Sequence, residues 1–442
     1  MFSTQFCCPR RAASQLKRGR SWRLAPLSLG AVVLCWSPSR AQAADSPGQL
    51  ASPAQTVTLA QVAELALVHN TDLRSSGQDV AAARGALVQA GVLPNPGLFV
   101  GTFARGISPL QGPVPSQFGL TWTLPIGGKR AAGVAAADAS LSASKATNAA
   151  VRLQLQLNAA TGFVNLLLAQ ALLSFALSDQ QAFAQTLELN ELRFKDGKIA
   201  YGDVLKLRIQ ALATDDAVRQ AQQNVIGGRA DLAQLAGEGA LAEEFTVAGS
   251  LEAMPPAPHV TPDSLFAAAL QKRNDYLALA SQEESARHAL SQARRQPIPD
   301  IGILVDYNHS GGLPDSYDLL LSVPIPLFDR NSGNIQQAEA ALAKVGIARE
   351  ALRNQLRDLA VKAVAEWNAS SAQAAAYGRG IEGAKESLEI SRRLYQAGRG
   401  SLLDFVGAEI SFRQVATAYR SALARSTLAN YSLRFVGGEE IR

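Results

Sequence analysis

The chain has 442 residues, with 42 Lys and Arg, 37 Asp and Glu, and a formal net charge of +5. Residues 1–43 carry seven of the basic residues and no acidic one, which leaves residues 44–442 with 35 basic and 37 acidic side chains, a net charge of −2. The positive net charge therefore comes from the N-terminal 43 residues, and the rest of the chain gives no support for nucleic-acid binding. All three cysteines also lie in residues 1–43, which excludes disulfides and thiolate metal sites from the remainder.

Residues 1–43 have the features of a secretory signal peptide. Basic residues are followed by an apolar run at 24–36 and then by Ala41-Gln42-Ala43. A small-x-small site after such a run is typical of signal-peptide cleavage, and the run is too short to be a transmembrane helix. We expect the mature chain to begin at Ala44. We do not expect lipidation of Cys35, because valine and leucine rather than small residues precede it.

A short helix is expected to open the first of two repeated units, which spans 57–238 and follows an N-terminal segment at 44–56. Thr58 and Gln61 match a capping box, in which each side chain accepts a hydrogen bond from the other residue's backbone N–H at a helix start. The helix is expected to end at a turn that contains two closely spaced prolines, Pro94 and Pro96.

Two segments with alternating side chains follow, at about 98–107 and 117–124. In the first segment, Phe99 and Phe103 share one face. Alternation over eight to ten residues is typical of a transmembrane β-strand, although each segment alone is a weak signal. The expected lipid-facing side chains of the second segment are Phe118, Leu120, Trp122 and Leu124.

A very long helix and a return helix are predicted after the turn at Pro125. No proline occurs between Pro125 and Pro255, and the residues are mostly good helix formers. We expect a helix at about 134–194, roughly 90 Å long at 1.5 Å per residue, then a break at Gly197 and a return helix at 202–235. A helix of this length needs a lateral partner, so the pair should form an antiparallel hairpin.

The second unit, at 260–438, repeats this order after a linker at 239–259. Thr261 and Pro262 are expected to start its opening helix, as a cap and a first-turn proline. Later elements are expected as strands at 301–309 and 317–323, a helix at 335–397, a break at Gly398, a return helix to about 435 and a tail at 439–442. The expected lipid-facing side chains of the last strand are Tyr317, Leu319, Leu321 and Val323.

The two units are also related residue by residue. The first proline pair, Pro94 and Pro96, recurs as Pro297 and Pro299 at an offset of 203. An aromatic-x-x-Gly-x5-Asp motif occurs twice at an offset of 201. Such coincidences rarely arise by chance, and a repeat must be recognised before a fold is assigned. The expected turns between helices and strands contain Pro94, Pro96, Pro125, Pro297, Pro299, Pro324 and Pro326.

Two interpretations of the strands stay open. They could be hairpins that pack one face on a soluble core, or they could enter a membrane. Four strands cannot close a barrel, and open strand edges do not occur in lipid, but three copies would supply twelve strands. After residue 43 we expect no apolar stretch of the roughly 18 residues that a spanning helix needs, and we interpret the apolar run at 163–177 as bundle core.

A signal peptide and two copies of helix, two strands, very long helix, glycine break and return helix resemble the TolC-type outer-membrane efflux channels. The resemblance covers essentially the whole chain after residue 43. The strand-to-helix exits at 124–130 and 323–331 resemble those of its heavy-metal, cobalt-zinc-cadmium (CzcC-like) branch. The resemblance implies a mainly α fold with a transmembrane β part, in which a homotrimer forms a 12-stranded β-barrel in the outer membrane of a Gram-negative bacterium and an α-helical barrel in the periplasm.

The resemblance also implies partners and a site. The tips of the helical hairpins should dock onto a periplasmic adaptor (a membrane fusion protein) and an inner-membrane pump of the resistance-nodulation-division type. The residues placed at the tips, as gate and adaptor contact, are Phe194, Gly197, Asp203, Tyr395, Gly398 and Asp404. The two aspartates could cap the return helices or form acidic rings that select cations. Tyr395 is expected to bond Asp203 of a neighbouring tip, and Gly407 stands where such channels often have a second acidic residue.

No catalytic, cofactor-binding or metal site is expected, and neither is enzyme activity. Gly127-Gly128-Lys129 lacks the earlier glycine and the following Ser or Thr of a phosphate-binding loop. The four histidines are far apart in the sequence. We therefore expect a passive exit duct, conducting divalent heavy-metal cations in a tripartite efflux system. The alternatives are efflux of organic compounds, type I protein secretion, or a periplasmic coiled-coil scaffold.

Overall fold

A computed structural model describes residues 55–102, 116–237, 239–251, 260–309 and 314–441. The expected signal peptide, the loop at 103–115 and most of the linker lie outside these residues. The described part of the chain contains eight helices and six strands, in two successions of short helices, two strands and a helical hairpin. This is the order that the sequence repeat predicts.

Each repeat opens with two helices, where the sequence analysis expected one. In the first repeat these are α1 (Leu59–His69) and α2 (Thr71–Ala90), separated by Asn70. Asn70 has an extended backbone, and its side chain accepts hydrogen bonds from the first turn of α2. In the second repeat α5 (Pro262–Lys272) and α6 (Asn274–Arg295) are separated by Arg273. The expected caps are present, since Thr58 forms a capping box with Gln61 and the Thr261 hydroxyl accepts from the backbone of Ser264.

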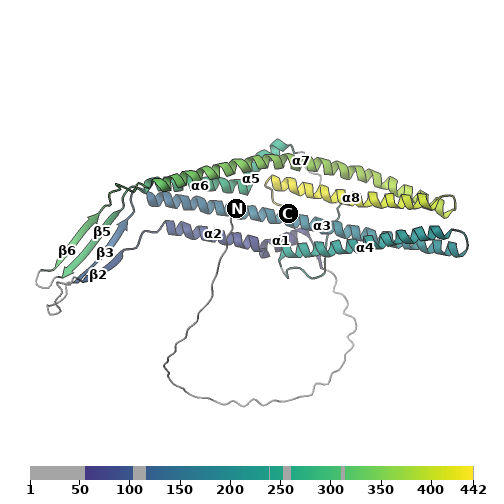
Figure 1. Cartoon of the computed structure of the whole chain (residues 1–442), viewed down its shortest axis with the longest axis horizontal. Coiled ribbons are helices and arrows are strands. Elements are labelled where there is room, and N and C mark those ends of the chain that lie inside the picture. Colours follow the sequence, from purple (N-terminus) through teal and green to yellow (C-terminus); the bar gives the residue numbers. More distant parts are fainter. Residues whose placement is uncertain (1–54, 103–115, 238, 252–259, 310–313, 442) are drawn as a thin grey trace, which may run out of the picture. The chain divides into compact units, whose positions relative to one another are not determined.

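Two helical hairpins dominate the fold. Helix α3 (Lys129–Lys195, 67 residues) lies beside α4 (Tyr201–Ala236), and α7 (Ser332–Gln396, 65 residues) lies beside α8 (Leu402–Val436) (Figure 1). At 1.5 Å per residue α3 is about 100 Å long. It also packs against α6 and α8, so it joins the two repeats. Both long helices start after a residue in the left-handed conformation, Gly128 (φ 74°) and Asn331 (φ 60°).

The main sheet has four antiparallel strands in the order β2, β3, β5, β6. They are β2 (Gly97–Thr102), β3 (Ser116–Leu124), β5 (Ile301–His309) and β6 (Ser316–Ser322). Strand β3 is the second strand of the first repeat and β5 is the first strand of the second repeat. Because β3 and β5 pair, the sheet joins the two repeats. In the described chain β2 and β6 each have one unpaired edge.

A second, smaller sheet was not predicted. Strand β1 (Gln55–Val57) pairs in parallel with β4 (Phe245–Val247). Val57 and Phe245 are each 1% exposed and belong to a core cluster with side chains of α1, α3 and α4. The linker between the repeats is therefore anchored in the first hairpin.

Helix α3 is more apolar than the sequence analysis expected. One 18-residue window has a mean hydropathy of 1.7 and is long and apolar enough to cross a membrane, by length and composition alone. No such stretch was expected after residue 43. Phe163 and Leu166 of this helix lie in the core cluster with Val57 and Phe245, and 33% of the apolar window is buried.

Candidate functional site

One face of the main sheet is apolar across all four strands. Leu120 lies opposite Leu98 on one side and Val305 on the other, and Val305 lies opposite Leu319. Residues that are directly opposite in a ladder share a face, so the apolar alternation of each strand is in register with that of its neighbour. This face is exposed, with Leu98 71%, Leu120 54% and Leu319 70% exposed. Its other large side chains are Val100, Phe118, Trp122, Leu124, Ile301, Ile303, Tyr307, Tyr317 and Leu321.

The residues expected to face lipid lie on this face, with one displaced from its strand. Rings of Phe118 and Tyr307 lie 5.1 Å apart, and those of Tyr307 and Tyr317 lie 5.3 Å apart, which forms an aromatic row across three strands. Leu124 is the last residue of β3, whereas Val323 lies one residue beyond β6. Seven of the eight residues expected to face lipid therefore lie within β3 or β6, and the eighth, Val323, follows β6. The seven are Phe118, Leu120, Trp122, Leu124, Tyr317, Leu319 and Leu321.

The opposite face is mostly polar. Asp306 lies directly opposite Asp318, an arrangement that is unfavourable for two like charges. Neutral amides separate them: Asn308 Nδ2 lies 2.7 Å from Asp318 Oδ2 and 3.4 Å from Asp306 Oδ2, and the Gln117 amide also donates to Asp306. Within the described residues no group of three or more His, Cys, Asp or Glu side chains could hold a metal ion.

Phe99 lies on the polar face of the sheet, a face that the sequence analysis did not assign. The sequence analysis placed Phe99 on one face with Phe103; because Phe103 lies outside the described residues, that expectation stays a prediction. Phe99 is opposite Gly119 in the ladder, and a Cβ on Gly119 would lie 2.7 Å from its ring. The sequence gives Phe99 an apolar neighbour on each side, so alternation alone could not assign its face.

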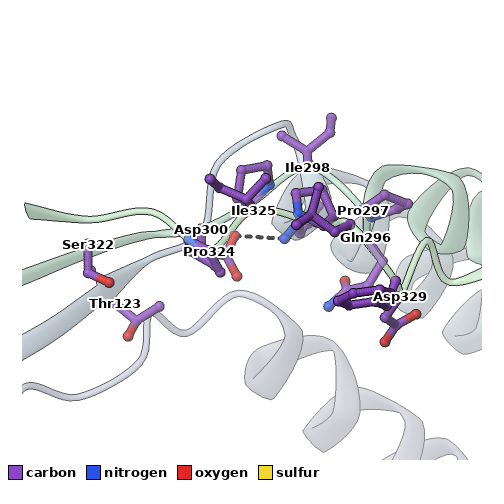
Figure 2. A pocket seen from close by; sticks show the side chains of 15 residues that line it. Thr123, Gln296, Pro297, Ile298, Asp300, Ser322, Pro324, Ile325 and Asp329 are labelled. Carbon is purple, nitrogen blue, oxygen red and sulfur yellow. Dashed lines mark hydrogen bonds and ion pairs between the residues drawn. The ribbon is translucent and has the colours of Figure 1, made fainter.

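The turns before β5 and after β6 contain four of the expected prolines and line a pocket of about 630 Å³ (Figure 2). Pro297, Ile298, Pro324 and Ile325 contribute to its wall. Pro94 and Pro96 precede β2, Pro125 follows β3, Pro297 and Pro299 precede β5, and Pro324 and Pro326 follow β6.

An ion pair between a buried lysine and a partly exposed aspartate joins the two repeats. Lys129 is 7% exposed, and its Nζ lies 2.8 Å from Oδ1 of Asp300. The same carboxylate oxygen accepts a hydrogen bond from the backbone N–H of Ile126 at 3.2 Å. Asp300, which immediately precedes β5, thus binds the start of α3 and the exit of β3 together.

The two hairpin turns have the same backbone structure. Gly197 and Gly398 both have φ of 71°, a conformation that favours glycine. After α3 the N–H of Lys198 donates to the carbonyl of Arg193 at 2.8 Å, and after α7 the N–H of Arg399 donates to Leu394 at 2.9 Å. This is the hydrogen-bond pattern of a Schellman motif, so both glycines are required by turn geometry.

The two tip aspartates occupy equivalent first-turn positions but have different partners. Asp404 Oδ2 accepts from the Ser401 hydroxyl at 2.7 Å, and the Ser401 oxygen accepts from the Asp404 N–H at 3.1 Å, which caps α8. Ala200 precedes α4 and supplies no side-chain cap, while Asp203 Oδ1 lies 3.3 Å from Lys206 Nζ. Ser401 is therefore the N-cap of α8, and the Asp404 carboxylate binds the hydroxyl of that cap.

Tyr395 is a buried residue that joins the two hairpins. It is 9% exposed, and its hydroxyl donates to Oδ1 of Asn190 at 2.6 Å. Its ring stacks on Phe405 with centroids 5.5 Å apart, and burial raises the pKa of its hydroxyl. Within the chain the Tyr395 hydroxyl therefore donates to Asn190, and a bond to Asp203 of a neighbouring copy stays a prediction. Phe194, in contrast, is 39% exposed.

A buried charge cluster lies between the hairpins, and the sequence analysis missed it. Arg413 on α8 places Nε 2.7 Å from Oδ2 of Asp179 on α3, and Nη2 3.8 Å from Oε1 of Glu409. Glu409 is 3% exposed. Burial, then the charge of Asp179, raises the pKa of Glu409 to about 7, while Arg413 and Arg392 oppose the rise. Each residue is an ordinary helical charge in the sequence, so only the pairing of helices reveals the cluster.

Comparison with known proteins supports both repeats. A model of the family described as outer membrane efflux protein matches residues 62–238 and 265–439. The chain is similar to the cobalt-zinc-cadmium resistance protein CzcC of Cupriavidus metallidurans, with 25% identity over 413 residues, 90% of this chain and 96% of that protein.

Solved structures share the fold. VceC of Vibrio cholerae has a TM-score of 0.73 and 22% identity, covering 87% of this chain and 97% of its own. The open state of MtrE from Neisseria gonorrhoeae has a TM-score of 0.73 and 20% identity, with 87% and 89% covered. CusC has a TM-score of 0.72 and 20% identity, with 91% and 99% covered. Because the family match covers both repeats, this chain belongs to the outer membrane efflux protein family, the TolC-type family that its sequence resembles, and is an outer-membrane protein.

Proposed function

We propose that three copies of this chain form the exit duct of a tripartite efflux system. The observation that carries the proposal is the two-faced sheet, which exposes a continuous apolar face and leaves β2 and β6 unpaired on one side. Exposed strand edges cannot remain in lipid. Three copies would supply twelve strands, pair every edge and turn the apolar face to the lipid, with the helical hairpins forming a barrel in the periplasm.

The polar face would then line a water-filled path. Asp306 and Asp318 from each copy would give the barrel an acidic interior together with Gln117 and Asn308. Acidic linings raise the local concentration of cations. This supports divalent heavy-metal cations as cargo, as does the likeness to CzcC, a protein named for cobalt, zinc and cadmium resistance.

The hairpin tips are the proposed periplasmic entrance. Asp203 and Asp404 lie in the first turns of α4 and α8, and three copies would gather them into rings at the entrance. Phe194, Gly197, Tyr395 and Gly398 complete the surface that we assign to gating and adaptor contact. The chain conducts passively, and a resistance-nodulation-division pump joined through a periplasmic adaptor would drive the cargo.

Growth of a deletion strain tests the cargo. The strain is challenged with zinc, cobalt, cadmium, nickel and copper, and separately with dyes, detergents and antibiotics, with complementation by the wild-type gene as the control. We expect sensitivity confined to divalent metals. Sensitivity to organic compounds alone would refute metal cargo and favour the organic-compound alternative, and loss of a secreted protein would favour type I secretion.

The oligomer and the membrane location are tested on the purified protein. We expect a trimer that requires detergent and is recovered in the outer-membrane fraction. A monomer that is soluble without detergent would refute the channel and favour a periplasmic scaffold.

A further inference from the structure

A second cavity lies between the two helical hairpins near their turns, and two arginines contribute to its wall. It has a volume of about 180 Å³ and is lined by residues of α3, α7 and α8. We refer to it as the hairpin cavity. Its lining includes Arg193 of α3 and Arg392 of α7, and the described residues contribute no Asp or Glu to it. The wall of the hairpin cavity is therefore positively charged.

The neutral polar side chains that join the helices at this wall are bonded to groups of the chain itself. The Tyr395 hydroxyl donates to Oδ1 of Asn190 at 2.6 Å, and Asn190 Nδ2 donates to the carbonyl of Thr186 at 2.8 Å. Arg193 donates from Nη2 to the carbonyl of Gln396 at 2.8 Å. A guanidinium has five N–H donors, so Arg193 keeps further donors for a ligand.

Arg392 lacks the ion pair that its repeat equivalent forms. In the first hairpin Glu191 of α3 and Arg208 of α4 pair at 2.8 Å. The equivalent residues at an offset of 201 are Arg392 and Glu409, with the charges reversed, but Glu409 lies beside Arg413. Arg392 forms no ion pair with any residue that the structure describes, and its Nε is shielded from solvent without an acceptor. A shielded N–H without an acceptor is unfavourable, so Arg392 is suited to bind an acceptor from outside the chain.

Other charges near the hairpin cavity do not cancel its positive wall. Helices α3 and α7 both end beside it, and each helix end contributes only about −0.5 elementary charge. Burial raises the pKa of Asp179 and of Glu409, and Arg392 opposes both rises. Arg413 lies 2.7 Å from Asp179 and compensates its charge. Glu409, with a pKa of about 7, is mostly neutral at about pH 6.

We propose that the hairpin cavity binds a small oxyanion, of the class of sulfate, phosphate or a carboxylate, between the guanidiniums of Arg193 and Arg392. Guanidinium groups donate paired, charge-assisted hydrogen bonds to such oxygens. The volume sets the size of the ligand, because a water molecule takes about 30 Å³ and the cavity therefore admits a group of a few non-hydrogen atoms. The site lies within one chain and does not rest on the trimeric duct proposed above.

A bound oxyanion would add a link between the two hairpins. Arg193 and Arg392 belong to different hairpins and lie close to the C-terminal ends of α3 and α7. Tyr395 with Asn190, and Arg193 with Gln396, already join these two helices. The oxyanion would neutralise the repulsion between the two guanidiniums, and we expect it to slow the opening of the last turns of both helices.

Isothermal titration calorimetry of the full chain in detergent tests the site. Sulfate is titrated at about pH 6 and at constant ionic strength set with sodium chloride, and we expect saturable binding of one ion per chain. Arg392→Gln should weaken sulfate binding by about tenfold to a hundredfold, because it removes a charged donor. The matched control is Arg393→Gln, the next residue, whose side chain is 78% exposed and pairs with Glu389. Absence of saturable binding, or equal weakening by the two variants, would overturn the site.

Two further variants keep the test valid if Arg392→Gln perturbs the fold. Arg392→Lys keeps the charge that acts on Asp179 and Glu409 but loses the planar fork, so its affinity for sulfate should lie between those of the wild type and Arg392→Gln. Glu409→Gln removes the nearest competing carboxylate and should bind sulfate at least as tightly as the wild type. Weaker binding by Glu409→Gln would contradict the assignment of Arg392 to the oxyanion.

Competition and hydrogen exchange establish the chemical class and the location. Acetate, a planar oxyanion, should displace sulfate, whereas chloride at the same concentration should not. Equal displacement by chloride would reduce the effect to charge screening and overturn the site. Sulfate should also slow amide exchange in the last two turns of α3 and α7 in the wild type and in Arg393→Gln, but not in Arg392→Gln. Because sulfate stabilises proteins generally through its exclusion from their surfaces, slowing that is the same in all three proteins would count against the hairpin cavity.

Discussion

Replacing Glu409 with glutamine should stabilise the protein at alkaline pH. Glu409 is buried beside Asp179 between α3 and α8, and its pKa rises from the ordinary 4.5 to about 7. A tenfold change in proton affinity corresponds to about 1.4 kcal/mol, so the ionised carboxylate costs the folded state about 3 kcal/mol. Glu409→Gln removes this charge while keeping the shape, and Arg413 retains Asp179 as a partner 2.7 Å away.

The direction of the pH dependence follows from the raised pKa. The folded state binds the Glu409 proton more tightly than the unfolded state does. The contribution of this group to stability is therefore fully present below about pH 4.5, and it is lost as the pH rises through about 7. We expect Glu409→Gln to match the wild type near pH 4, to begin to exceed it above about pH 4.5, and to exceed it by about 3 kcal/mol per chain near pH 8.

The assay is the urea midpoint of the far-ultraviolet circular dichroism signal of the protein in detergent, measured across this pH range. The control is Glu389→Gln on α7, where the glutamate side chain is 49% exposed and pairs with Arg393 on the surface. This variant should follow the wild type at every pH. Parallel curves for Glu409→Gln and the wild type, or a less stable Glu409→Gln near pH 8, would refute the reasoning.

Three further variants test the sheet and the tips. Leu120→Lys should reduce the yield of assembled trimer on a semi-native gel, since a lysine facing lipid costs about 2–4 kcal/mol near the midplane, and a normal yield would contradict the assigned face. Tyr395→Phe should lower the free energy of unfolding by about 1–3 kcal/mol, because it leaves the buried Asn190 oxygen without its donor, and an unchanged urea midpoint would argue against that bond. Asp203→Asn should leave assembly intact but reduce cation preference in planar-bilayer recordings, and unchanged selectivity would assign Asp203 to helix stabilisation alone.

The sequence predicts the elements of this fold well because its signals are local or repeated. Prolines and glycines limit where helices can run, so the turns at Pro94, Pro297, Gly197 and Gly398 could be placed before any tertiary contact was known. The alternation of Phe118 to Leu124 likewise assigns a strand and its face. These signals depend on backbone chemistry within a few residues, and the repeat provides a second copy of each.

Interactions between distant helices could not be predicted in this way. Asn190 and Tyr395 are 205 residues apart, and nothing near either residue marks it as a partner. The sequence analysis assigned Tyr395 to a neighbouring Asp203, because a tyrosine at a tip has several polar groups within reach. The burial of Asp179 and Glu409 could not be predicted either. A carboxylate on a helix is usually exposed to solvent, and these two are buried only because α8 packs against α3.

The two hairpin turns are capped differently, so the first turns of α8 and α4 differ in how easily they unfold. Ser401 closes the first turn of α8 with its side chain, whereas Ala200 leaves that of α4 without a side-chain acceptor. A cap of this kind is worth about 1 kcal/mol, which corresponds to about a fivefold difference in how often a first turn opens. In the proposed trimer, the three α4 starts that open more often would alternate with the three α8 starts that open less often around the periplasmic end. The six hairpins look nearly equivalent, but their opening would follow threefold symmetry.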